Sequence, residues 1–122
     1  MEKIKEKAQD ILRELNILQY RDAHPMSLSS GEKQRVAIAG AILSERKIII
    51  YDEPTSGLDY ISMMQVAGLI QKLKNRGTTQ FIITHDKEFL DECCDTVICF
   101  ENGHIKKLLR QIPLNIKCEN IQ

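Results

Sequence analysis

The sequence of 122 residues has no tryptophan, and aromatic residues make up only 5% of it. A platform on which nucleic-acid bases could stack is therefore not expected. There is also no excess of charge of either sign, because 17 Lys and Arg residues balance 17 Asp and Glu residues. A neutral chain lacks the basic surface that favours nucleic acids, so we expect no nucleic-acid partner.

Membrane-spanning and metal-binding patterns are missing as well. The apolar run Ile48–Tyr51 is far too short to cross a bilayer, and the charged stretch after Met1 is unlike a signal peptide. Four cysteines, at positions 93, 94, 99 and 118, form no Cys-x-x-Cys pair and have no histidine at finger spacing. We therefore expect reduced thiols in a reducing compartment and no zinc site.

Apolar residues in the chain follow two different periods, one helical and one typical of buried strands. Helical spacing predicts an amphipathic helix over residues 2–15, a second helix over 31–44 with a face of small residues, and further helices over 61–75 and 87–94. Continuous apolar runs predict strands at 47–51 and 80–84, buried on both faces, and a strand at 96–100. A turn at 101–103 leads to a fourth strand at 104–108, and 20–30 and 52–59 are loops. Strands that alternate with helices predict an α/β fold with a largely parallel sheet.

Two stretches of the chain place polar residues where parallel sheets bind ligands. Asp52 and Glu53 follow a buried strand, and His85 follows the next one, so all three are expected at one edge of the sheet. One acid of such a pair can hold Mg²⁺ while the other acts as a general base toward water. The alternative is a loop that begins with solvated acids.

A second candidate is the segment Leu28–Glu32, in which serine and glycine open directly onto a helix. Free amides at a helix N-terminus bind phosphate well. The alternative is an ordinary N-cap in which Ser29 or Ser30 caps the helix and Glu32 complements its dipole.

Taken in order, LSSGEKQR, KIIIYDEPTSGLD and FIITHD closely resemble the ATPase domain of ABC proteins. Leu28–Glu32 matches the signature loop, Ile48–Glu53 the Walker B strand, Ser56–Asp59 the D-loop and His85 the switch histidine. The resemblance covers about residues 1–110. It implies a partial P-loop NTPase-like, RecA-like fold with a mostly parallel sheet and part of the ABC helical subdomain.

The resemblance implies roles for individual residues. Asp52 would support Mg²⁺, Glu53 would polarise the hydrolytic water, and His85 would contact the γ-phosphate of ATP. The signature loop and the D-loop would bind or sense a nucleotide held by a second ABC ATPase domain in a head-to-tail dimer; the residues concerned are Ser29, Ser30, Gly31, Glu32 and Asp59. Ser30 and Glu32 depart from the usual Gly and Gln of the family.

The family's division of the domain implies three segments here. Residues 1–45 would be part of the helical subdomain, 46–110 the C-terminal half of the ATPase core, and 111–122 a tail. No glycine of the sequence is followed by lysine, so GxxxxGK[ST] does not occur within these 122 residues. Because this loop and its lysine hold the nucleotide phosphates, we expect the isolated chain to be inactive. The resemblance also implies that the strand before this loop lies between strands 80–84 and 96–100. Without that shared neighbour their edges are unpaired, so we expect the chain to self-associate or to need a complementing segment.

Several functional hypotheses remain open at this stage. The first is a fragment of a transporter ATPase that couples ATP binding and hydrolysis to transport, working with a membrane-spanning subunit from the cytoplasm at the inner face of the cell membrane. The segment after the D-loop is similar to ATPases of energy-coupling-factor importers for cobalt or vitamins. The second is a non-catalytic module that completes the nucleotide site of another ABC ATPase in trans. A non-transport ABC ATPase and an inactive remnant are the remaining alternatives.

Overall fold

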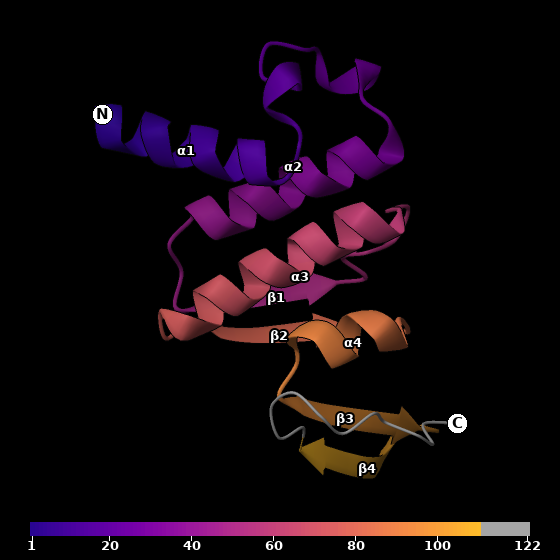
Figure 1. Ribbon diagram of the computed structural model, residues 1–122. Helices are drawn as coiled ribbons and strands as arrows, with labels where there is room; N and C mark the ends of the chain where they lie inside the picture. Colours follow the sequence, from indigo (N-terminus) through magenta and orange to yellow (C-terminus); the bar gives the residue numbers. More distant parts are fainter. Residues whose placement is uncertain (111–122) are drawn as a thin grey trace.

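The computed structural model describes residues 1–110 and contains four α-helices, two short 3-10 helices and four strands (Figure 1). Their order along the chain is α1 (Glu2–Glu14), η1 (Leu18–Tyr20), η2 (Pro25–Ser27), α2 (Ser30–Leu43), β1 (Ile48–Asp52), α3 (Tyr60–Asn75), β2 (Thr79–Ile83), α4 (Lys87–Cys93), β3 (Thr96–Glu101) and β4 (His104–Arg110). Each predicted helix and strand is confirmed, with ends that differ by one or two residues. Cys118 and the predicted tail lie outside the described residues.

The strands form two separate two-stranded sheets rather than one. β1 and β2 pair in parallel, with Ile48 opposite Thr79 and Asp52 opposite Ile83. β3 and β4 pair as an antiparallel hairpin with a bulge between Cys99 and Phe100. Within residues 1–110, β2 and β3 are not neighbours in a ladder although they are consecutive strands. The predicted α/β class with a parallel sheet is confirmed.

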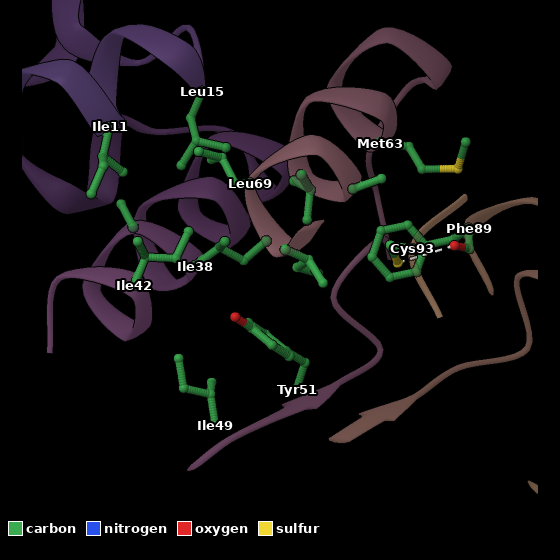
Figure 2. Packing of buried hydrophobic residues seen from close by; sticks show 14 of the residues in the cluster. Ile11, Leu15, Ile38, Ile42, Ile49, Tyr51, Met63, Leu69, Phe89 and Cys93 are labelled. Carbon is green, nitrogen blue, oxygen red and sulfur yellow. Dashed lines mark hydrogen bonds between the residues drawn. The ribbon is translucent and has the colours of Figure 1, made fainter. Parts of the chain in front are cut away.

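The hydrophobic core lies between the helices and one face of the β1–β2 sheet (Figure 2). Leu15 just after α1, Val66 of α3 and Phe89 of α4 are completely buried, and Ile49 and Tyr51 face them from β1. The phenol of Tyr51 donates to Oε1 of Gln80 at 2.8 Å, which satisfies this buried hydroxyl. Burial raises the pKa of Tyr51 to about 12.

The expectation that β1 and β2 are buried on both faces is wrong, because Ile48, Ile50, Phe81 and Ile83 are each more than half exposed. Helices cover one face of this sheet, and in residues 1–110 no second layer covers the other. A continuous apolar run predicts a strand with two apolar faces, but it does not supply the layer that would bury the second one.

The packing face of α2 also differs from the prediction. The predicted face consisted of Val36, Ala37, Ala39, Gly40 and Leu43. Ala39 is buried and Leu43 is half-buried, as predicted, but the other three are exposed, and Ile38 and Ile42 are buried instead. The helix carries apolar residues on nearly all sides, so its sequence gives no single preferred face.

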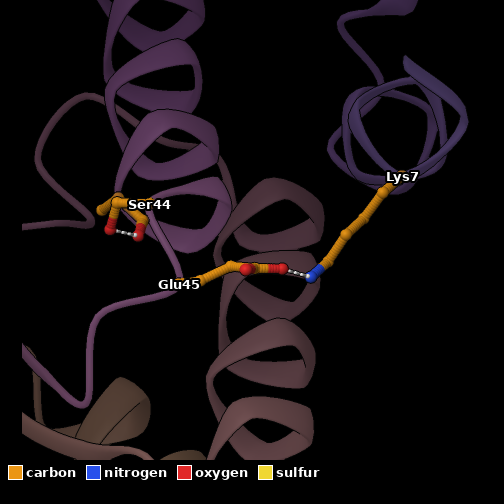
Figure 3. Close-up of polar contacts among 4 residues, drawn as sticks. Lys7, Ser44 and Glu45 are labelled. Atoms are coloured by element: carbon orange, nitrogen blue, oxygen red, sulfur yellow. Dashed lines mark hydrogen bonds and ion pairs between the residues drawn. The ribbon is translucent and has the colours of Figure 1, made fainter. Parts of the chain in front are cut away.

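Helices α1 and α2 are joined by polar contacts at both ends. Lys7 of α1 forms an ion pair with Glu45, just beyond α2, where Ser44 also donates to the carbonyl of Ala41 (Figure 3). At the other end, Nη1 of Arg35 donates to the carbonyl of Leu15 at 3.0 Å. These contacts fix the direction of α2 and therefore the place of its first turn.

Candidate functional site

The two predicted acids lie at the carboxyl end of β1. Asp52 is the last residue of the strand and is exposed, and Glu53 follows it with a positive φ of 48°. The amide of Glu53 donates to the carbonyl of Ile83, the last residue of β2, at 2.8 Å. This conformation costs a residue with a Cβ about 1–2 kcal/mol, so it is uncommon outside glycine.

His85 lies beside Glu53, as expected from the parallel strands. Its Nε2 is 3.6 Å from Oε1 of Glu53, which is beyond the length of a hydrogen bond. The imidazole is 99% exposed and the Glu53 side chain 40% exposed. A carboxylate and an imidazole from two different strands are therefore adjacent and open to an incoming ligand.

The loop that follows Glu53 is tied to the loop that contains His85. Oγ1 of the buried Thr55 donates to Oδ2 of Asp86 at 3.2 Å. Asp86 also caps α4, since its Oδ1 accepts from the amide of Phe89, and its own amide donates to Oγ1 of Thr84. Sequence reasoning missed Thr55 and Asp86, although an Asp directly before a predicted helix is a capping signal.

The N-terminal turn of α2 is built as a complete capping box. The amide of Glu32 donates to Oγ of Ser29 at 3.2 Å, and the amide of Ser29 donates to Oε2 of Glu32 at 2.7 Å. Hydrogen bonds from Ser29 and Tyr20 lower the pKa of Glu32, so this carboxylate is ionised at neutral pH. The ordinary capping interpretation of this segment is therefore correct for Ser29 and Glu32, and Ser30 is exposed next to them.

This turn also touches the loop after β1. A Cβ added to Gly31 would lie 2.9 Å from the carbonyl oxygen of Gly57, closer than side chains tolerate. Gly57 has a φ of 76°, and a Cβ added there would lie 3.4 Å from Oγ of Ser30. The structure thus brings the predicted signature loop and D-loop together within one chain, with two glycines at the contact.

Asp59, the last predicted site residue, caps α3. Its Oδ1 accepts from the amide of Ser62 at 2.7 Å, and the bonds to Ser62 lower the pKa of this carboxyl. The Asp59 carboxylate therefore stabilises the N-terminus of α3.

Sequence reasoning also missed two residues of α2 that contact the site. Nε2 of Gln34 donates to the carbonyl of Glu53 at 3.1 Å. Arg35, next to it, lowers the pKa values of Glu32 and Asp59 through its charge, as a minor cause in each case. A position three residues after Gly31 lies on the same side of the helix, and that spacing is the signal that could have found Gln34.

The site residues fit magnesium bound together with a phosphate ligand rather than a protein cage. Within residues 1–110 there is no group of three or more His, Cys, Asp or Glu side chains placed to hold a metal ion. Mg²⁺ in phosphate-transfer sites uses one or two carboxylates and completes its shell with phosphate oxygens and water. The exposed carboxylate of Asp52, at the end of a strand, meets that requirement.

Comparisons with known proteins point to one family. Residues 2–56 match the family model described as ABC transporter. The arginine transport ATP-binding protein ArtP of Escherichia coli is 38% identical over 99 residues, which are 81% of this chain and 41% of that protein. The chain has the sequence and fold of part of an ABC transporter ATPase domain.

Solved structures show the same likeness in three dimensions. A dimeric ATP-binding cassette in a post-hydrolysis state, bound to ADP and Pi, superimposes with a TM-score of 0.77 at 28% identity, covering 86% of this chain and 46% of that one. The structure of cbiO1 from Clostridium perfringens, part of the ABC transporter complex cbiONQ, gives 0.68 at 32% identity, covering 88% and 43%. The fragment therefore spans less than half the length of these relatives. No helix within residues 1–110 is long and apolar enough to span a membrane.

Proposed function

We propose that this fragment supplies the hydrolytic face of an ABC-type ATP site. The observation that carries the proposal is the pairing of Glu53 and His85 at 3.6 Å, at the ends of two parallel strands and beside Asp52. The likeness to ATP-binding subunits of transporters supports this assignment. Because these 122 residues contain no GxxxxGK[ST], the loop that holds the phosphates comes from residues other than these.

Each residue has a chemical task in this proposal. Glu53 orients the attacking water and accepts its proton, since its carboxylate is partly exposed and fixed by the backbone. His85 donates to a γ-phosphate oxygen and, through its contact with Glu53, helps to place that carboxylate. Asp52 would hold Mg²⁺, which neutralises phosphate charge when bound.

The first turn of α2 would contact a different nucleotide from the one at Glu53. We propose that Ser29, Ser30 and Gly31 face the γ-phosphate of a nucleotide held by another ABC ATPase domain in a head-to-tail dimer, with Glu32 and Asp59 beside them. The helix dipole favours an anion at this turn, and the ionised Glu32 opposes it. The structural similarity of this chain to a dimeric ATP-binding cassette supports the proposed dimer.

The transported solute is proposed from the relatives. The name of the arginine transport relative favours an amino-acid importer, at 38% identity. The energy-coupling-factor branch is the second candidate, supported by the structural likeness to cbiO1 at 32% identity. In either case the fragment would act with a membrane-spanning subunit, from the cytoplasmic side of the membrane.

A hybrid subunit tests the hydrolytic role. Residues 1–110 replace the matching segment of the arginine transport ATP-binding protein of Escherichia coli, and ATP hydrolysis is measured. We expect activity in the hybrid and a loss of about 10²-fold or more in Glu53→Gln. The control Glu6→Gln, which removes an exposed carboxylate of α1, should cause no loss. Equal activity of Glu53→Gln and the parent hybrid would contradict the proposal.

A mixing experiment tests the alternative of a non-catalytic partner. The 122-residue chain is added to a complete ABC ATPase, and hydrolysis is measured with and without it. Stimulation that disappears with Ser29→Asp, which keeps a capping side chain on α2, supports completion of the site in trans. An unchanged rate of hydrolysis rejects the role in trans. The hydrolytic role is tested separately by the hybrid subunit.

A further inference from the structure

The backbone of Glu53 is held on both sides by hydrogen bonds. Its amide donates to the carbonyl of Ile83 at 2.8 Å, and its carbonyl accepts from Nε2 of Gln34 at 3.1 Å. Between these two bonds the residue keeps a φ of 48°, which is unfavourable for a residue with a Cβ. The direction of its side chain, and so its approach to His85, depends on this conformation.

Gln34 reaches Glu53 from the same helix face that contacts the loop after β1. Gly31, one turn earlier, packs so closely on Gly57 that a Cβ would lie 2.9 Å from the carbonyl oxygen of that residue. The Gln34 side chain is half-buried and its contact with Glu53 spans 19 positions of the sequence. The first turns of α2 and the loop after β1 therefore meet at two points, a backbone contact and a side-chain hydrogen bond.

We propose that Gln34 is a positioning residue for Glu53, which couples the N-terminal turn of α2 to the carboxylate that would activate water. The inference rests on the proposed function. Without the amide donor, the carbonyl of Glu53 turns to solvent, φ relaxes toward negative values, and the carboxylate swings away from His85. A displacement of the α2 turn by a nucleotide on a partner domain acts on Glu53 through the same bond.

The bond ends on a main-chain atom, which gives the inference a distinctive consequence. Gln34 acts only by aiming the side chain at position 53. Once the carboxylate is removed by Glu53→Gln, a change at Gln34 has nothing left to misplace. A residue that merely stabilises the fold would still lower activity in that background.

Kinetics of the hybrid subunit test the coupling. Gln34→Glu keeps the size of the side chain and replaces the amide donor with an acceptor, and Gln34→Met removes the donor without adding charge. We expect each variant to lower kcat by about 10-fold to 100-fold with KM changed less than about twofold, because displacement of a catalytic group costs rates of this order. In the Glu53→Gln background the same variants should lower kcat by less than about twofold.

Gln71 provides the matched control. Its Nε2 donates to the carbonyl of Glu92 and links α3 to α4 by the same kind of side-chain-to-backbone bond, and neither residue is one of the predicted site residues. Gln71→Glu should leave kcat within about twofold of the parent. Unchanged kcat in both Gln34 variants overturns the proposal, as does a loss that persists in full in the Glu53→Gln background.

Amide hydrogen exchange of the 122-residue chain separates this inference from the proposed function. Loss of one hydrogen bond corresponds to about a fivefold change in an opening equilibrium. Gln34→Glu should therefore speed exchange at the Glu53 amide by about fivefold or more, and Gln71→Glu should not. Absence of ATP hydrolysis in the parent hybrid would contradict the proposed function. Unchanged exchange of the Glu53 amide in both Gln34 variants would overturn the positioning role, whatever the result with the hybrid.

Discussion

The contact between Gly31 and Gly57 predicts opposite effects for two identical substitutions in one helix. Gly31→Ala places a methyl group 2.9 Å from the carbonyl oxygen of Gly57, a backbone atom that moves only with its loop. Such overpacking costs about 1–3 kcal/mol. Gly40→Ala, in the same helix, meets no atom within 4 Å and gains helix propensity, which stabilises by about 0.8–1.0 kcal/mol.

Urea unfolding followed by circular dichroism measures both effects. With an m-value of about 1.5 kcal/mol/M, the midpoints of the two variants should differ by more than about 1 M. The two sites lie roughly 13 Å apart along the helix, so Gly31→Ala can also be measured in the Gly40→Ala background, where its effect should be additive. Measurement at two protein concentrations shows whether self-association contributes to the midpoint. Gly31→Ala at or above the stability of the parent chain would refute the close contact.

Three further predictions concern the core and the sheet. Burial raises the pKa of Tyr51 to about 12, so this phenol ionises more readily in the unfolded chain than in the folded one. The free energy of unfolding should therefore fall by about 2 kcal/mol between pH 10 and 12. In Tyr51→Phe this fall should be correspondingly smaller. Phe89→Ala should lower the unfolding free energy by about 3–5 kcal/mol, because this ring is fully buried. Ile50 and Phe81 face each other across the exposed side of the sheet, so replacing both with Thr should lower the weight-average mass in sedimentation equilibrium; an unchanged mass would show that this face does not drive association.

The secondary structure was predictable because the relevant signals are local. The apolar spacing of α1 and α3, the β-branched run of β1 and the turn after β3 each lie within a few neighbouring residues. Burial was less predictable, since it depends on what a neighbouring layer covers. Ile48 and Ile50 are as apolar as Ile49, but only Ile49 meets the helices.

The site divides in the same way. The approach of His85 to Glu53 followed from a general rule, that parallel strands end at one edge of a sheet. The spacing from Gly31 could have pointed to Gln34, but its bond to Glu53 could not be predicted, because a main-chain carbonyl acceptor leaves no trace in the residue type at position 53. The contact between Gly31 and Gly57 was hidden for a similar reason, since it joins two backbones.

The predicted site residues differ in how clearly mutagenesis can assign them a function. Ser29, Glu32 and Asp59 each hold a helix terminus, so their replacement weakens α2 or α3 whether or not a nucleotide binds. Glu53 and His85 contact each other and solvent through their side chains. A loss of hydrolysis in Glu53→Gln with unchanged stability therefore bears on chemistry alone. For the α2 turn, only a variant that keeps the cap can separate binding from folding, and Ser29→Asp is the suitable choice, because Asp caps a helix as well as Ser while its charge repels a phosphate.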